Sequence, residues 1–329
     1  MTQGELAARA QVSRALVGAL ERGRHMPAAD AAIRVAQALG TSVERLFADR
    51  TVEPAVAAVP ALGGRLSDGT LVRVAWVDET MVARVMDATA ALSAVGASAD
   101  GVVLDGQVRL FPGAAARGVV IAGCDPVLGI AEGLLERAGN ARVVGVPTTS
   151  GRALEALEAG RCHGALVHGP AKSLKPPSQG LQRWHLARWR SGVGTHPQLS
   201  RPSLEAIVAG EVPTVQRDRT AACQQAFERA ARRLGAPRPK PRATACGHLD
   251  AARSAIEQGA AAVVIEPVAV AMGLDFSALE VHDVELWVPD AWAGLSGIRA
   301  LIDMLASPGF HDRVGALPAY DLTATGASR

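Results

Sequence analysis

Small and polar residues that could hold a ligand follow two consecutive apolar runs in the middle of the chain. The runs are 119–121 and 143–146, and each leads through a short loop into a helical pattern. Unpaired backbone N–H groups at such helix starts favour a small anion or another polar ligand. The loop residues that would meet it are Gly123, Cys124, Asp125, Thr149 and Ser150.

Elements around these loops predict how the residues are brought together. The runs 119–121, 143–146 and 164–167 are typical of buried parallel strands, and His168 stands at the end of the third. Parallel strands place their carboxyl ends at one sheet edge, where open α/β sheets bind ligands. Strand and helix patterns also alternate from 186 to 317, so the fold class is α/β over most of the chain.

Composition narrows the class of protein. The chain has 329 residues, of which 49% are hydrophobic and 20% are charged, and its formal net charge is +2. This is the composition of a globular protein with two or three domains, and we expect a cytoplasmic location because neither a membrane span nor a signal peptide is evident. The four cysteines lack Cys-x-x-Cys spacing, so no disulfide, metal site or cofactor is expected. Catalytic motifs are lacking too, so no enzyme is predicted.

The first 50 residues have the pattern of short helices joined by tight turns. Thr2 and Glu5 have the spacing of a capping box, and Ser13 precedes a second helical pattern over 14–22. Gly40 is expected to end a third helix that begins after Pro27. Two helices joined by a tight turn, the second bearing arginines, are typical of a helix-turn-helix.

This region resembles the Cro/Xre-type DNA-binding domain. The resemblance lies in the Thr-Gln opening, in Val12-Ser13-Arg14, in Glu21-Arg22-Gly23 and in the closing Leu39-Gly40. It implies a small all-α domain over 1–50, without a counterpart of the family's usual first helix. Some side chains should approach phosphates and others the major groove. The residues implied are Gln3, Ser13, Arg14, Ala15, Gly18, Arg22 and Arg24.

The second part resembles the periplasmic-binding-protein-like domain of molybdate-type binding proteins. The resemblance covers 70–322, after a Pro- and Gly-rich linker over 51–69, and is carried by residues 122–126, the Ser150 loop and the tail 317–321. It implies a two-lobed α/β domain that closes on a ligand by a hinge motion. The first lobe would comprise about 70–168 and 285–322, and the second about 180–284.

The resemblance also implies which residues meet the ligand. The segment 216–224 lacks the glycines and the final arginine of the relatives' anion loop, which argues against molybdate. Alternative roles are a helix cap for Asp125, a buried filler for Cys124 and a hydrogen-bonded wall for His168. The full set comprises Gly123, Cys124, Asp125, Thr149, Ser150, His168, Arg217, Arg219, Thr220 and His248.

These observations predict a cytoplasmic transcriptional regulator that binds double-stranded DNA as a homodimer, in the manner of other helix-turn-helix proteins, and senses a small polar or anionic effector. Neither a cofactor nor a membrane partner is expected. The alternative is a degenerate module that binds DNA or a protein without a ligand and uses its α/β domain for dimerisation.

Overall fold

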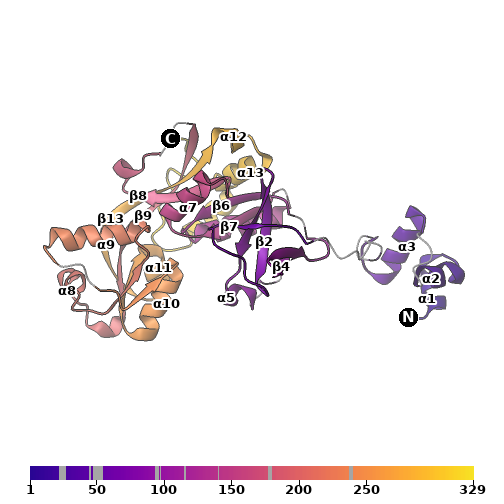
Figure 1. The fold of residues 1–329 in the computed structure, drawn as a ribbon, viewed down its shortest axis with the longest axis horizontal. Coiled ribbons are helices and arrows are strands. Elements are labelled where there is room, and N and C mark those ends of the chain that lie inside the picture. The colour runs from indigo at the N-terminus through magenta and orange to yellow at the C-terminus, as the bar shows by residue number, and fades with distance from the viewer. Residues whose placement is uncertain are drawn as a thin grey trace. The chain divides into compact units, whose positions relative to one another are not determined.

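The chain forms two compact units, Met1–Pro54 and Ala55–Arg329 (Figure 1). They are seen in a computed structural model. The residues it describes are 1–21, 27–43, 46, 55–92, 96, 98–114, 116–139, 141–176, 180–236 and 240–329.

In its described residues, the first unit contains three helices around a small apolar core. The predicted capping box is confirmed: Glu5 N donates to Thr2 Oγ1 over 3.3 Å, and Thr2 N donates to Glu5 Oε2 over 2.7 Å. Gly40 ends the third helix in the left-handed conformation, with φ of 67°. Ala10, Val35 and Ala38 form the buried core. The helices are α1 (Gln3–Ala10), α2 (Arg14–Glu21) and α3 (Ala29–Leu39).

The second unit begins with a five-stranded sheet of order β1-β3-β2-β4-β5. Its strands pair antiparallel, except that β1 runs parallel to β3. Asp105 and Gly106 both have positive φ in the turn between β4 and β5, which is the conformation that an Asp-Gly pair favours in a hairpin. The elements are β1 (Val59–Pro60), β2 (Leu71–Val77), β3 (Thr80–Val85), α5 (Ala88–Ala91), β4 (Gly101–Leu104) and β5 (Gln107–Leu110).

This sheet departs from the expected organisation in two ways. The linker was expected over 51–69, but β1 pairs with β3 and Ala61 is buried, so 55–69 belong to the second unit. The strands up to residue 110 were assigned to the first lobe but form a sheet of their own. The Pro- and Gly-rich composition indicated turns correctly, but it did not reveal that the segments between these turns pair with a sheet.

The main sheet has eight strands in the order β11-β10-β12-β9-β13-β8-β6-β7. Its strands are β6 (Val119–Gly123), β7 (Val143–Pro147), β8 (Gly164–Gly169), β9 (Leu181–Thr195), β10 (Thr214–Arg217), β11 (Ala243–Ala245), β12 (Ala261–Ile265) and β13 (Asp275–Pro289). The α-helices are α6 (Val127–Ala138), α7 (Ser150–Glu158), α8 (Leu204–Ala209), α9 (Ala222–Arg233), α10 (His248–Gln258), α11 (Glu266–Ala271), α12 (Asp290–Ala293), α13 (Ser296–Leu305) and α14 (Pro308–Gly315). Two short 3₁₀ turns are η2 (Ala171–Ser173) and η3 (Pro197–Leu199).

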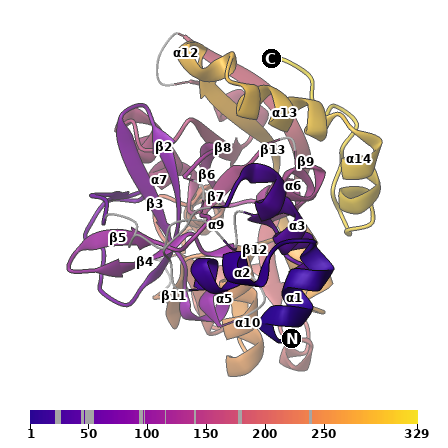
Figure 2. The same ribbon diagram turned by 90° about the vertical axis from the view of Figure 1, so that its right-hand side faces the viewer.

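Two long strands join the lobes. β9 and β13 pair antiparallel along almost their whole length, with the strands of the first lobe beside β13 and those of the second lobe beside β9. Register shifts between Ala278 and Glu280 and between Val284 and Glu285 bend β13 where it crosses. The expected boundary between the lobes, at 284–285, lies within β13 at the second of these shifts. Figure 2 shows α13 and α14 beside α6, so the end of the chain returns to the first lobe.

A buried ion-pair network joins the small sheet to the first lobe. Glu132 on α6 pairs with Arg73 on β2 and, over 3.3 Å, with Arg84 on β3. Glu136, one turn later, pairs with Arg73 over 3.1 Å but has a half-exposed side chain. Buried charges need such partners because the interior solvates them poorly.

Replacing Glu132 with Gln should destabilise the second unit by about 3 kcal/mol or more, because it leaves buried arginines without their carboxylate. The matched change Glu136→Gln, one turn along the same helix, should cost less than about 1 kcal/mol because that carboxylate is half exposed. Urea unfolding followed by circular dichroism gives both values. Equal midpoints for the two variants would contradict this account of the joint.

Candidate functional site

Residues predicted to hold a ligand converge where the two lobes meet. Cys124 follows β6 and His168 lies in β8, both in the first lobe, whereas His248 begins α10 in the second lobe. One potential ligand atom from each of the three lies within 4.8 Å of the others. His168 and His248 are buried, and Cys124 is half-buried.

Asp125 anchors this junction by accepting three hydrogen bonds. Its Oδ2 accepts from Trp189 Nε1 on β9 over 2.8 Å. Its Oδ1 accepts from Tyr320 Oη and from Val127 N, both over 2.9 Å. Burial raises the pKa of Asp125, and these three donors oppose that shift. Because both oxygens are engaged, Asp125 positions other residues, and α6 starts at Val127, one residue later than a cap at Asp125 requires.

Trp189, which donates to Asp125, lies beside three histidine rings. Its ring centroid lies 4.7 Å from that of His168, 5.5 Å from that of His282 and 6.4 Å from that of His248. Trp189, Tyr320, Cys223 and His282 were not among the predicted site residues. Tyr320 belongs to the tail that carried the family resemblance, but Trp189 and His282 lie inside the long crossing strands, and no local motif marks them.

A chain of hydrogen bonds fixes the orientation of His168. His168 Nδ1 lies 3.0 Å from His282 Nδ1, and His282 Nε2 lies 3.2 Å from Glu280 Oε2. Glu280 in turn accepts from Arg229 over 2.8 and 2.7 Å, and these bonds lower the pKa of Glu280 to about 2. Burial lowers the pKa of His168 well below its usual value, so its ring is neutral at neutral pH.

Arg217 contacts His248, whose ring centroid lies 6.2 Å from that of His168. Arg217 Nη1 lies 2.6 Å from His248 Nδ1, and its Nε and Nη2 donate to the carbonyls of Ala245 and Cys246. Because arginine only donates, His248 Nδ1 must accept, which leaves the hydrogen of this neutral ring on Nε2. That Nε2 is buried and has no hydrogen-bond partner among the residues that the structure describes. Burial, followed by the Arg217 charge, lowers the pKa of His248 well below its usual value.

Two further predicted residues, Thr149 and Thr220, form a direct contact between the lobes. Thr149 Oγ1 lies 2.6 Å from Thr220 Oγ1, and Gly151 N donates to Thr220 O over 3.3 Å. Thr149 also caps α7, while Ser150 Oγ accepts from His168 N over 3.2 Å within the first lobe. The contacts of Thr220 with Thr149 and Gly151 therefore hold a closed arrangement of the lobes.

Gly123 and Cys124 lie at the end of β6, where each has a structural role. A Cβ at Gly123 would lie 2.4 Å from Leu166 Cβ, so this glycine permits close packing of neighbouring strands. Burial raises the pKa of the Cys124 thiol, which therefore stays protonated at neutral pH in the structure as it stands. A reactive thiolate at this position is not favoured.

A cavity of about 390 Å³ opens beside Arg217. Arg219, which is exposed, and Lys240 contribute two further cationic side chains, and Asp218 contributes one acid. The remaining lining residues are Gln216, Gln224, Pro241 and Thr244. Net positive charge favours an anion in this cavity.

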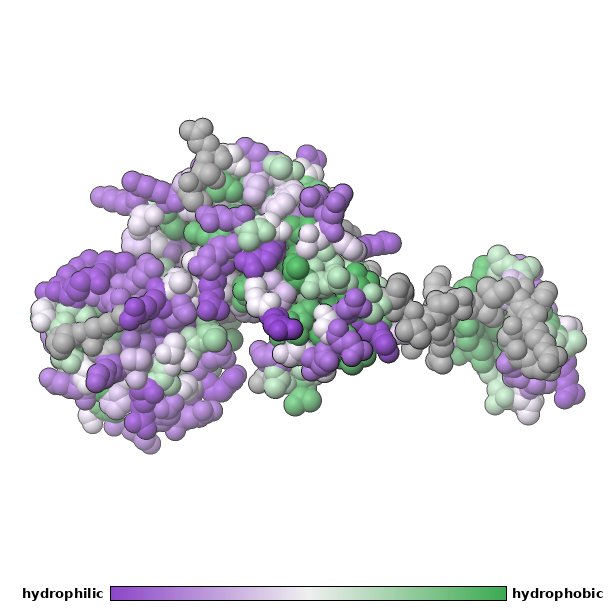
Figure 3. All heavy atoms as spheres, viewed as in Figure 1, coloured by the Kyte–Doolittle hydropathy of each residue, from purple (hydrophilic) through white to green (hydrophobic). Residues whose placement is uncertain are grey.

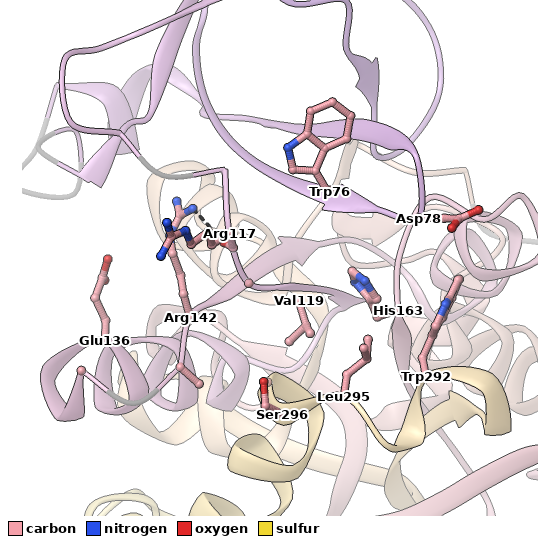
Figure 4. A pocket seen from close by; sticks show the side chains of 14 residues that line it. Trp76, Asp78, Arg117, Val119, Glu136, Arg142, His163, Trp292, Leu295 and Ser296 are labelled. Atoms are coloured by element: carbon pink, nitrogen blue, oxygen red, sulfur yellow. Dashed lines mark hydrogen bonds between the residues drawn. The ribbon is translucent and has the colours of Figure 1, made fainter. Parts of the chain in front are cut away.

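A second cavity, of about 880 Å³, lies between the small sheet and the first lobe (Figure 4). Trp76, His163 and Trp292 line it together with Arg142. Arg142 is already bound to the carbonyls of Val74 and Arg117 and to the Asp100 carboxylate. Burial lowers the pKa of His163 to about 4, and its Nδ1 accepts from Val120 N. The side chains of Arg142 and His163 are thus already engaged in hydrogen bonds within the protein, where the small sheet meets the first lobe.

In the first unit, the predicted DNA-contacting residues have distinct surroundings. Gln3 Nε2 donates to Glu21 over 2.5 Å, and Ser13 Oγ accepts from Leu16 N at the start of α2. Arg14 and Ala15 are exposed on α2. Gly18, expected on the groove-facing side, is instead buried beside Val17 because it faces the core of the unit. Arg22 and Arg24 lie outside the described residues.

Family comparisons agree with this architecture. A family described as "PBP superfamily domain" matches residues 131–306, which is more than half of the chain. The chain belongs to the PBP superfamily. A family described as "Helix-turn-helix" matches residues 1–46, so this PBP-superfamily protein carries an N-terminal Cro/Xre-type helix-turn-helix domain. No curated protein matches the chain.

Solved structures that resemble this chain have low sequence identity to it. A putative phosphate ABC transporter substrate-binding protein with bound phosphate from Clostridium perfringens has a TM-score of 0.50 and 14% identity, over 62% of this chain and 99% of that one. The tungstate ABC transporter from Geobacter sulfurreducens has a TM-score of 0.45 and 14% identity, over 61% and 99%. The C-terminal domain of a probable LysR family transcriptional regulator from Rhodococcus sp. RHA1 has a TM-score of 0.41 and 18% identity, over 58% and 99%.

In the part of the chain that the structure describes, none of the helices has the length and apolar character needed to cross a membrane. The matched domains are a DNA-binding domain and a ligand-binding domain, and domains of these two kinds are typically not enzymes.

Replacing Gly151 with Ala should weaken the closed contact by about 1–3 kcal/mol, because the new Cβ would lie 2.8 Å from Thr220 Cβ and 3.1 Å from Thr220 O. Gly129→Ala in α6 is a matched control, since nothing lies within 4 Å of its Cβ position. Hydrogen exchange measured by mass spectrometry should be faster in peptides containing Gly151 and Thr220 only in the first variant. The same exchange in both variants would show that this contact does not hold the lobes.

Proposed function

We propose that this protein is a cytoplasmic transcriptional regulator that binds double-stranded DNA and responds to a small anionic effector held between its two lobes. The DNA-binding part of the proposal is supported by the helix-turn-helix match and by the exposed Arg14 on α2. The sensing part is supported by the PBP-superfamily match and by the buried cation in the junction.

Arg217 is the observation that carries the choice of an anion. Its side chain is buried, yet among the described residues no carboxylate forms an ion pair with it. Buried charges are normally paired, so a bound anion supplies the missing partner. The unpartnered N–H at His248 Nε2 gives the same anion a second donor, and Arg219 and Lys240 line the cavity beside it.

Closure of the lobes would connect effector binding to DNA binding. An effector that binds the closed form better shifts the population toward that form. Thr149 and Thr220 then meet across the junction. Pairing of two chains would give the helix-turn-helix domains their half-site spacing, so we propose a homodimer.

The small sheet supports pairing through exposed apolar side chains. Figure 3 shows mainly hydrophilic residues over the visible face of the second lobe and more apolar ones over the region of the small sheet. Large apolar side chains on or near this sheet are each at least 37% exposed, and association of two chains would reduce their exposure. They are Val59, Leu62, Trp76, Val85, Leu92 and Phe111.

A second candidate function is a module that binds DNA or a protein without an effector. One observation favours it: the closed contacts of Thr149, Gly151 and Thr220 form between protein groups alone. A domain locked in this way would serve dimerisation, and effector screens would give no response.

Anions should stabilise the full chain in a thermal-shift screen that includes phosphate, sulfate and small carboxylates. A concentration of 100 times Kd corresponds to about 2.7 kcal/mol of stabilisation. Arg217→Gln should abolish this response because the buried cation is lost. Arg242→Gln should retain it, since Arg242 is an exposed arginine of the same lobe that bonds Gln258. A flat screen for the unaltered chain would favour the second candidate function.

DNA binding is tested with Arg14→Ala, using fluorescence anisotropy and a fragment from upstream of the coding sequence. Loss of a base contact should weaken binding by about 1–3 kcal/mol, or about 5- to 150-fold. The control is Arg137→Ala, which removes an exposed arginine from α6 in the other unit. Equal affinities of the two variants would argue against α2 as the DNA-reading helix.

A further inference from the structure

The junction of the lobes also contains nitrogen and sulfur atoms that could bind a metal ion. Besides the group of Cys124, His168 and His248, a second group consists of His168, Cys223 and His282, again with one ligand atom from each within 4.8 Å of the others. Each member of the second group is fully or almost fully buried. Its members come from β8 in the first lobe, α9 in the second lobe and the crossing strand β13.

Hydrogen bonding distinguishes the two groups. Because His248 Nδ1 accepts from Arg217, this ring presents an N–H to the junction and not a lone pair. His282 is the reverse case: Glu280 accepts its Nε2–H, which leaves the lone pair on Nδ1. A carboxylate behind a histidine is the usual support of a metal-bound imidazole.

The spacing of the two Nδ1 atoms also fits a metal ion. His168 Nδ1 and His282 Nδ1 are 3.0 Å apart. Two histidine nitrogens at 2.0–2.1 Å from one tetrahedral ion are about 3.3 Å apart, so a small outward movement of the rings would admit the ion. The ion would take the place between these nitrogens: the His168 proton would move from Nδ1 to Nε2 of the same ring, and the thiol protons of the ligating cysteines would pass to solvent.

We propose that His168, His282 and Cys223 form a binding site for a soft or borderline transition-metal ion, with Zn²⁺ as the reference species. Nitrogen and thiolate ligands select such ions over Mg²⁺ or Ca²⁺. Cys124, whose sulfur lies within 4.8 Å of a ring nitrogen of His168, is the fourth ligand. Two cysteines and two histidines form a common tetrahedral zinc set.

This site shares the junction of the lobes with the anion position at Arg217. Its ligands come from both lobes and from β13, so a bound ion would fasten the lobes together at their crossing. The expectation of no metal rested on cysteine spacing along the sequence. That argument does not apply to ligands contributed by four separate elements.

The test uses the tag-free full chain, reduced, stripped with a chelator and titrated with Co²⁺. We expect one Co²⁺ per chain, a thiolate-to-cobalt charge-transfer band in the near ultraviolet and displacement by Zn²⁺. Cys223→Ser should lose most of the band. Cys162→Ser should retain it, because this equally buried cysteine lies outside the cluster and contacts Ala153 O.

The Glu280→Gln variant distinguishes a role of Glu280 in supporting the bound metal from a role in folding. It should weaken Co²⁺ binding by about 10- to 100-fold while the band persists, because both thiolates remain. Circular dichroism confirms that each variant is folded. Lack of a band in the unaltered chain, or an undiminished band in Cys223→Ser, would overturn the proposal. DNA binding of the same samples reports on the proposed regulator separately, so a failure of the metal site is distinguishable from a failure of that function.

Discussion

The junction of the lobes depends on the carboxylate of Asp125. It accepts hydrogen bonds from the start of α6, from Trp189 on the crossing strand β9 and from Tyr320 near the end of the chain. Segments far apart in the sequence are thereby fixed to one buried charge, and Trp189 is held against the rings of His168, His248 and His282. An arrangement of three donors around two oxygens suits the ionised carboxylate, which only accepts.

Around this anchor the polar groups divide into two sets with different chemistry. Arg217 and His248 present hydrogen-bond donors, and the guanidinium brings an unpaired positive charge. His168, His282 and Cys223 present lone pairs and a thiol, oriented by Glu280 and Arg229. The first set suits an anion and the second a soft cation. Both sets draw on the two lobes, so either ligand would favour the closed arrangement.

Much of this organisation could be predicted from the sequence because local rules set it. The capping box of α1, the Asp105-Gly106 hairpin and the strand-loop-helix units around Asp125 and Ser150 follow from short-range preferences. Of the predicted ligand residues, His168, Arg217 and His248 do meet at the junction. The family resemblance implied their convergence, because His168 lies in the first lobe and Arg217 and His248 lie in the second, and closure of two lobes brings such residues together.

The remainder depends on long-range pairing that no local pattern encodes. His282 and Trp189 enter the cluster because β9 and β13 pair in a particular register, with β13 bent by two register shifts. Likewise, Cys223 could not be connected with His168, 55 positions away, from spacing alone, and the segment 59–85 gave no sign that it builds a sheet separate from the first lobe. Gly18 was placed on the exposed face by analogy, whereas its surroundings bury it.

The central claim is that closure of the lobes controls DNA binding, and one measurement tests it most directly. The affinity of the full chain for the DNA upstream of its coding sequence is measured for Gly151→Ala and Gly129→Ala side by side, by fluorescence anisotropy. Coupling energies of about 1–3 kcal/mol predict that the two affinities differ by about 5- to 150-fold, because only Gly151→Ala obstructs the contact with Thr220. Identical affinities, with and without anions, would contradict the claim.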